Sequence, residues 1–380
     1  MRIAFIFNWD CNMQRPHHWV IEAVKRGHEA DVYDTSPRWP WRRLQVSPDY
    51  ATRIYRAPTR TVERLVHRLV GPHSGIAKRL KSQFTARSAK IWETLWNSPA
   101  NKRYDAVIFC GPVPCMVRRE KWGIPLVYDC MDQWDGFPQA NPRALEFEAS
   151  LAAIADVIWA VTPGLADRLG KRHGVEKCHV LPNGCDYDHF STVQGRKRPR
   201  GWVEGRPVVG YAGVVAAWFN WDAVLETATT LPNAIIWVIG SCHTEIPSVL
   251  PDNVVLEGFV PYESLPEYYA GFDLAMVPFK GDLLLKGVSP IKLYEYLAAG
   301  KPVVASSLPD AVSLRSEGIV EVADNPKEFA QTCAHVLSGD SNRGLAMERQ
   351  RIARGHSWAA RWGLCESLIF RQVASECVGD

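Results

Sequence analysis

Residues 289–306 read SPIKLYEYLAAGKPVVAS and bring a lysine, a glutamate and a helix start into one short stretch. Pro290 suits the first turn of a helix, because its missing N–H is no loss there and its φ is already helical. Leu293 and Leu297 lie four residues apart and predict a buried helix face. Gly300 is expected to end the helix, and the apolar run after it predicts a short buried strand.

A helix of this kind can hold an anion. Its N-terminus carries a partial positive charge and free N–H donors. Lys292 adds a full positive charge in the first turn, and Glu295, one turn further on, can accept hydrogen bonds from sugar hydroxyls. The alternative is an ordinary amphipathic helix with both side chains in water, and the helix taken alone leaves both interpretations open.

The composition predicts an ordinary two-domain protein. A chain of 380 residues is long enough for two hydrophobic cores, and a net charge of +3 does not predict a polyanionic partner. The ten cysteines show neither a C-x-x-C pair nor zinc-ligand spacing, so we expect reduced thiols in a cytoplasmic protein. We expect neither a signal peptide nor a transmembrane helix, because Met1-Arg2 leads straight into a predicted strand and no apolar run has transmembrane length.

The first 34 residues predict the opening of a doubly wound domain. RIAFIF at 2–7 and EADVYD at 29–34 are predicted strands, with a helix from about 17 to 26 between them. The loop after the first strand lacks G-x-G-x-x-G, which argues against a dinucleotide held in the usual way. This loop places polar side chains where open sheets bind ligands, although surface polarity at a helix start is equally compatible; they are Gln14, Arg15, His17 and His18.

Three carboxylates lie where a later strand of the same half ends. Strands are predicted at 105–110, 125–130, 156–161 and 177–182, with helices at 142–155 and 162–170. Asp129, Asp132 and Asp135 fall at the end of the strand at 125–130 or in the loop after it, where they can bind acceptor hydroxyls or cap backbone amides. Their spacing does not require a metal.

Residues 53–90 differ from the rest of the first half, with ten Lys or Arg against a single acid, Glu63. Apolar residues recur at helical spacing from Val62 to Leu69. Such a stretch can lie on an anionic membrane, or it can be a core-packing helix with a solvated basic face. A nucleic-acid partner is not predicted, because no known binding motif accompanies the charge.

The strand–helix alternation restarts at 207 after a polar, basic segment at 191–206 that is typical of a linker. Further strands are predicted at 207–213, 234–240, 253–258, 272–278 and 301–306, and helix is expected after about 325. Gly213 ends the first of these strands, where the backbone can approach a phosphate closely.

Several motifs together resemble one enzyme family. The pattern P-x-K-x-x-E-x-L-A-x-G-x-P-V-V at 290–304 resembles the nucleotide-sugar site of retaining GT-B glycosyltransferases. The segment P-N-G-x-D-x-x-x-F at 182–190 resembles the one that closes the N-terminal domain of these enzymes. Gly258-Phe259-Val260 resembles the part that borders the base, and 356–370 resembles the closing helix. The similarity covers nearly the whole chain.

This resemblance implies an α/β fold with two facing Rossmann-like, doubly wound domains and a C-terminal helix that crosses back to the first. The implied boundaries are 1–190 for the N-terminal acceptor-side domain and 191–206 for the linker. Residues 207–355 would then form the nucleotide-sugar-binding domain, and 356–380 the returning helix.

The resemblance also implies a site. Glu295 would bind the ribose hydroxyls, while Lys292 and the helix amides would face the diphosphate, without a metal or other cofactor. The implied donor-binding residues are Gly213, Phe259, Val260, Lys286, Ser289, Pro290, Ile291, Lys292 and Glu295. On the acceptor side stand Gln14, Arg15, His17 and Asp129, with Asp132 as the candidate catalytic contact to the acceptor.

Two positions depart from the family pattern. Many relatives carry a first glutamate eight residues before Glu295, where this chain has Gly287. A basic residue after the 207–213 strand is also missing, so Lys280 or Lys286 is expected to supply that charge. The variant resembles teichuronic acid-type polysaccharide glycosyltransferases.

The implied activity is transfer of a sugar from a nucleoside diphosphate, with UDP as first choice, to a glycan or lipid-linked glycan with retention. A cytoplasmic enzyme, peripheral on the membrane through 53–90, would fit this role. The alternatives are a nucleotide-sugar epimerase on the same fold, a catalytically silent nucleotide-sugar-binding protein and, more distantly, a dehydrogenase.

Overall fold

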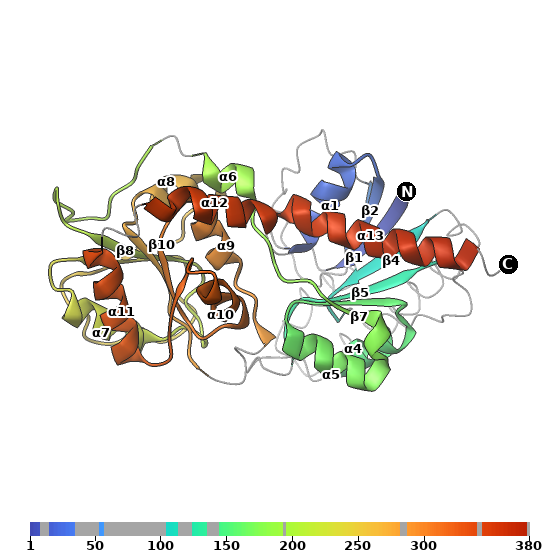
Figure 1. Cartoon of the computed structure of the whole chain (residues 1–380), viewed down its shortest axis with the longest axis horizontal. Coiled ribbons are helices and arrows are strands. Elements are labelled where there is room, and N and C mark those ends of the chain that lie inside the picture. Colours follow the sequence, from blue (N-terminus) through green and yellow to red (C-terminus); the bar gives the residue numbers. More distant parts are fainter. Residues whose placement is uncertain are drawn as a thin grey trace, which may run out of the picture. The chain divides into compact units, whose positions relative to one another are not determined.

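The computed structural model describes residues 1–7, 15–34, 53–56, 104–112, 124–134, 144–192, 195–281, 287–339 and 344–377. It contains two compact units (Figure 1). The first joins Met1–Leu181 with Trp362–Asp380, and the second is Pro182–Arg361. Gln14 and Lys286, both predicted site residues, lie outside the described residues, as does most of the basic stretch at 53–90.

The sheet of the first unit is parallel throughout and has the order β3-β2-β1-β4-β5-β6-β7. Its central strands are continuous apolar runs because helices cover both faces of such a sheet. Its strands are β1 Arg2–Phe7, β2 Glu29–Asp34, β3 Arg53–Arg56, β4 Ala106–Cys110, β5 Leu126–Cys130, β6 Val157–Ala160 and β7 Cys178–Val180.

The helices of this unit begin where the sequence supplies helix starts. In α5 (Pro163–His173), Thr162 caps the N-terminus by accepting a hydrogen bond from the amide of Leu165, and Pro163 occupies the first turn. The other described helices between its strands are α1 (Arg15–Lys25) and α4 (Ala144–Ile154).

The second unit repeats the architecture with the order β10-β9-β8-β11-β12-β13, again all parallel. The strand order reverses between β8 and β11, which is the topological switch point of a doubly wound sheet. Its strands are β8 Val208–Ala212, β9 Ile235–Ile239, β10 Val254–Gly258, β11 Leu274–Val277, β12 Val303–Ser306 and β13 Glu321–Ala323.

Helices pack in pairs around this second sheet, α11 against α7 and α12 against α9 (Figure 1). The buried apolar residues of strands and helices form one continuous core. The helices are α6 Tyr187–Ser191, α7 Trp221–Thr230, α8 Leu265–Ala270, α9 Ile291–Ala298, α10 Pro309–Ser316, α11 Pro326–Ser338 and α12 Ala346–Gly355.

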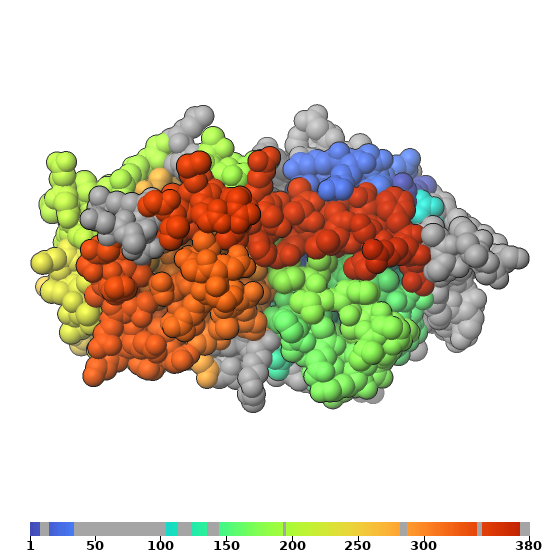
Figure 2. Space-filling model, viewed as in Figure 1, coloured from blue at the N-terminus to red at the C-terminus, as the bar shows by residue number. Residues whose placement is uncertain are grey.

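Helix α13 (Trp358–Cys377) begins in the second unit and continues in the first. Within the first unit, Trp362 is fully buried with its ring 6.0 Å from those of Phe5 and Trp19. Glu366 accepts a hydrogen bond from Arg26. In Figure 2 the red atoms of this helix form a strip beside the blue atoms of the N-terminal segment. The predicted fold class, including the returning helix, is confirmed.

The predicted boundary at 190 differs from the division of the structure, because the segment after Leu181 packs into the second unit. Phe190 is fully buried there and stacks on Tyr269. In the predicted linker, the amide of Lys197 donates to the carbonyl of Glu267. Residues 53–56, the described part of the basic stretch, form β3, which pairs with β2. The helical spacing predicted from Val62 onward lies outside the described residues.

Candidate nucleotide site

Helix α9 starts without a side-chain cap. Pro290 is its N-cap residue, with an extended conformation at φ −77° and ψ 115°, so the helix begins at Ile291 rather than at the proline. The N-cap makes no side-chain hydrogen bond to the first amides of the helix. The first turn therefore offers the N–H groups and the partial positive charge that suit an anion.

Glu295 is buried and held from one side. The Tyr269 hydroxyl donates to its Oε2 at 2.6 Å, and the Lys292 ammonium donates to the same oxygen at 2.9 Å. Only 2% of Glu295 is exposed, yet its Oε1 takes no hydrogen bond from any residue in the described part of the chain. The other carboxylate oxygen, Oε1, can therefore accept a hydrogen bond from a ligand.

The charge of Lys292 is partly compensated within the helix. Its side chain is 24% exposed and forms an i,i+3 ion pair with Glu295. The ammonium of Lys292 therefore pairs with a carboxylate in addition to lying in the first turn of the helix. A phosphate would have to compete with Glu295 for this group.

Ser289 fixes the approach to α9. Its hydroxyl accepts from the amide of Asn183 at 2.9 Å and donates to the Asp310 carboxylate at 2.5 Å. Burial raises the pKa of Asp310, while hydrogen bonds from Ser289 and Tyr294 act in the opposite direction. The hydroxyl of Ser289 was predicted to contact the nucleotide-sugar. In the structure it instead makes hydrogen bonds to Asn183 and Asp310.

Glycines close the carboxyl ends of β8 and β9. A Cβ on Gly213 would lie 2.7 Å from the Tyr211 hydroxyl, and one on Gly240 would lie 2.0 Å from the carbonyl oxygen of Gly213. Gly240 also has a φ of +134°, which disfavours any other residue. The loops after β8 and β9 therefore pack against each other through backbone atoms, with no room for a side chain at either glycine.

The end of β10 presents an exposed ring, because Phe259 is 68% exposed immediately after the strand. Val260 is partly buried against the core of the unit. By topology Gly213, Phe259 and the start of α9 all follow the carboxyl ends of strands in one sheet. Open sheets of this kind bind their ligands at that edge.

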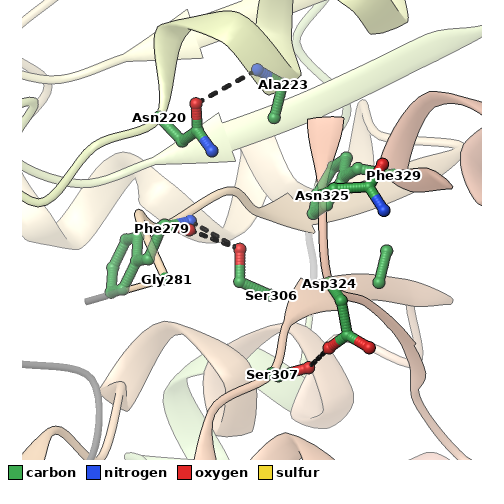
Figure 3. Close-up of a pocket in the computed structure, with 10 residues that line it drawn as sticks. Asn220, Ala223, Phe279, Gly281, Ser306, Ser307, Asp324, Asn325 and Phe329 are labelled. Carbon is green, nitrogen blue, oxygen red and sulfur yellow. Dashed lines mark hydrogen bonds between the residues drawn. The ribbon is translucent and has the colours of Figure 1, made fainter. Parts of the chain in front are cut away.

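A pocket of about 270 Å³ lies at the carboxyl ends of β11, β12 and β13 (Figure 3). Ser306 bridges both backbone groups of Phe279, and Ser307 donates to Asp324. Two helix caps, Asn220 and Asn325, also line it. The pocket was not predicted from the sequence, although Asn325 with Glu328 three residues later is the signature of a helix start.

In the first unit, the predicted acceptor residues Arg15 and Asp129 bind each other. The Arg15 guanidinium donates to both carboxylate oxygens, at 2.8–3.1 Å, and the Trp19 indole donates at 2.8 Å. Asp129 is completely buried. This geometry does not support the direct acceptor contacts predicted for the two residues, because a ligand would have to break the pair first.

The other described residues predicted for the acceptor side lie near this pair. Asp132 is partly buried, and burial raises its pKa to about 7; Arg15 opposes this change and Asp129 adds to it. His17 and His18 are both buried, and the ring of His17 packs edge-on against Phe7 at 5.3 Å. The structure thus brings Arg15, Asp129 and Asp132 together at the carboxyl end of β5.

Metal-binding and membrane-spanning features are both absent from the described residues. Their His, Cys, Asp and Glu side chains include no group of three that could hold a metal ion. Nor does this part of the chain contain a helix both long and apolar enough to span a bilayer.

Solved structures share this fold over nearly their full length. Sucrose-phosphate synthase from Thermosynechococcus elongatus is 15% identical, with a TM-score of 0.67 and 99% of each chain covered. Anabaena HepE, solved with UDP and glucose, is 16% identical, with a TM-score of 0.64 and coverages of 97% of this chain and 99% of that one. The fold is therefore the GT-B fold.

Sequence comparisons give the family. Residues 17–189 match the profile described as Glycosyltransferase Family 4, and 206–339 match Glycosyl transferases group 1. The chain is 28% identical over 270 residues to TuaH of Bacillus subtilis (strain 168). The name of that protein describes it as a teichuronic acid biosynthesis glycosyltransferase. That match spans 65% of this chain and 65% of TuaH, just under two thirds of each. The chain belongs to the GT-B glycosyltransferases of group 1 and family 4.

Proposed function

We propose that the protein transfers a sugar from a nucleoside-diphosphate sugar to a glycan or lipid-linked glycan, with retention of the anomeric configuration. UDP is the nucleotide of first choice, and HepE, which shares the fold, was solved with UDP. Polysaccharide synthesis is the proposed context, supported by the match to TuaH. The free thiols of the described cysteines fit a cytoplasmic location, which is part of the proposal.

One observation carries this proposal. At the start of α9, uncapped helix amides, an ammonium and a buried carboxylate with one unoccupied oxygen stand within two helical turns. Amides and ammonium suit the diphosphate, and the oxygen of Glu295 suits a ribose hydroxyl. A nucleoside diphosphate presents these two chemistries together.

The proposed chemistry is electrostatic. As the bond between the sugar and the diphosphate breaks, negative charge grows on the leaving phosphate, where Lys292 and the first amides of α9 stabilise it. These fixed positive groups take the place that a metal ion has in other transferases. The leaving phosphate accepts the proton of the incoming hydroxyl on the same face of the sugar, so no protein base is required.

On the acceptor side, Asp132 is the proposed contact for an acceptor hydroxyl. The buried, hydrogen-bonded pair of Arg15 and Asp129 would hold the end of β5 next to Asp132 in place. Burial holds the pKa of Asp132 near 7. Its carboxyl group can therefore donate or accept a hydrogen bond near neutral pH.

The test is nucleotide release from UDP-sugars, measured with and without candidate glycan acceptors. Release that depends on an acceptor supports transfer, isomerised UDP-sugar without acceptor indicates an epimerase, and binding without turnover indicates a silent binding protein. Lys292→Ala should lower turnover by roughly 100-fold or more. Lys327→Ala is the matched control, because Lys327 is also the second residue of a helix, α11, and is exposed.

The circular dichroism melting curve should show that both variants remain folded. Turnover in Lys292→Ala equal to that of the wild type would contradict the proposed phosphate role.

A further inference from the structure

We propose that Tyr269 is a positioning residue of the donor site: its hydroxyl anchors one oxygen of Glu295 so that the other oxygen faces the ribose of the nucleotide. The inference rests on the proposed function, since it takes a nucleoside diphosphate as the ligand. It adds a residue that the sequence patterns did not single out.

A carboxylate needs an anchor to point in one direction. The last torsion of a glutamate side chain is broad, so an unanchored carboxylate samples many orientations. In this site the hydroxyl of Tyr269 lies 2.6 Å from Oε2 of Glu295, and the ammonium of Lys292 lies 2.9 Å from the same atom. Two donors on one oxygen fix the plane of the group and therefore the direction of Oε1.

Lys292 can leave this arrangement, whereas Tyr269 cannot. If a phosphate draws the ammonium away, Glu295 loses one of its two donors. The hydroxyl of Tyr269 lies 3.4 Å from Nζ of Lys292, but its own hydrogen bond to Oε2 of Glu295 does not depend on the lysine. The tyrosine is thus the anchor that survives binding of the ligand.

The ring of Tyr269 is rigidly packed. Tyr269 is fully buried in α8, and Phe190 stacks on it with a centroid distance of 5.1 Å and an interplanar angle of 14°. Tyr296 packs edge-on against its ring at 5.0 Å. The hydroxyl cannot move unless the core moves, which is the condition for precise placement of a functional group.

The protonation state also fits this role. Burial, and next to it the charge of Glu295, raises the pKa of Tyr269 well above its usual value, so the hydroxyl keeps its proton and acts as a donor. The same geometry gives a role to the last residue of the P-N-G-x-D-x-x-x-F motif in this chain. That residue, Phe190, is the ring that packs on Tyr269.

The experiment compares two ligands, UDP and 2′,3′-dideoxy-UDP, by calorimetric titration. A charge-assisted hydrogen bond predicts that the wild type binds UDP roughly 10- to 100-fold more tightly than the dideoxy analogue. Tyr269→Phe removes only the hydroxyl and should weaken UDP binding about tenfold while leaving the analogue nearly unchanged. Replacement of Tyr269 by 4-aminophenylalanine, which restores a donor, should recover most of the preference.

Tyr268→Phe is the matched control, because the Tyr268 hydroxyl lies 3.4 Å from Glu257 on β10 rather than on Glu295. It should keep the full preference for UDP. If Tyr269→Phe does not fold, Phe190→Leu loosens the ring without removing the hydroxyl and should reduce the preference by a smaller factor.

Failure of the positioning role and failure of the proposed function give different results. A Tyr269→Phe protein that keeps the wild-type preference for UDP, or one that binds both ligands more weakly by the same factor, overturns the positioning role alone. A wild-type protein that binds none of UDP, GDP and ADP contradicts the proposed function itself.

Discussion

Asn183 and Ser289 are joined by two hydrogen bonds across 106 residues of sequence. The amide of Asn183 donates to the hydroxyl of Ser289 at 2.9 Å, and its side-chain Nδ2 donates to the carbonyl of Ser289 at 2.7 Å. Because Ser289 immediately precedes the cap of α9, this pair sets where the helix begins. The N-G turn after Leu181 is thus a support of the candidate nucleotide site.

Asn183→Ala should weaken both stability and nucleotide binding. It leaves the buried carbonyl of Ser289 without its side-chain donor, which costs about 1–3 kcal/mol of unfolding free energy. Urea denaturation measures this loss, and titration with UDP should show a weaker complex. Asn233→Ala, at an exposed position, is the control and should change neither. A variant as stable as the wild type would show that the second bond is dispensable.

The Arg15–Asp129 pair predicts a large effect on the first unit. Asp129→Asn removes the carboxylate charge that pairs with the buried guanidinium of Arg15, and loss of one partner of a buried pair costs roughly 3–5 kcal/mol. Urea denaturation followed by tryptophan fluorescence is the measurement. The double variant Arg15→Met/Asp129→Leu should recover part of the loss, because it removes both charges together. A single variant that loses less than about 1 kcal/mol would be incompatible with a buried ion pair.

Asp132 predicts a pH dependence of stability. Burial raises its pKa from 3.8 to about 7, so the folded chain holds a proton that the unfolded chain releases between about pH 4 and about pH 7. The unfolding free energy should therefore fall as pH rises through this window. A tenfold change in proton affinity corresponds to about 1.4 kcal/mol. The change in pKa from 3.8 to about 7 is roughly three such steps, so the total is on the order of 4 kcal/mol.

Asp132→Asn should remove this contribution, and the difference between the two proteins isolates it. Subtraction cancels the opposite contribution of His356, whose pKa is lowered to about 4, first by burial and then by Arg361. Urea denaturation at a series of pH values provides the comparison. Parallel curves for the two proteins across this pH range would contradict the assignment.

The basic stretch at 53–90 predicts binding to anionic membranes. Vesicles rich in phosphatidylserine should sediment the protein at low salt and release it at high salt, because screening weakens the attraction. Replacement of Arg60, Arg64 and Arg68 by glutamine should reduce the bound fraction severalfold, while neutral phosphatidylcholine vesicles serve as the control. Binding that is insensitive to salt and to these substitutions would exclude an electrostatic interface.

The central strands of both sheets could be predicted from the sequence. Runs such as AVIFC and IIWVI are apolar at every position because both faces of a parallel sheet are covered, and both form strands. Strand β13 and helix α10 were not predicted. The strand has only three residues, and the helix has little amphipathic pattern, so neither gives a clear periodic signal in the sequence.

The partners within the site were harder to predict. The bonds from Arg15 to Asp129 join residues 114 positions apart, and no local pattern encodes such a distance. The pair of Lys292 and Glu295 is different: their i,i+3 spacing on a predicted helix was a signal for an ion pair. Tyr269 could be placed only once the fold had brought its hydroxyl within hydrogen-bond distance of Glu295.

The burial of Trp362 among Phe5 and Trp19 makes the first unit discontinuous along the chain. During synthesis the ribosome has finished the whole second unit before this tryptophan emerges. The core of the first unit therefore cannot be completed until this C-terminal helix has been made, although the strands of that unit are synthesised first.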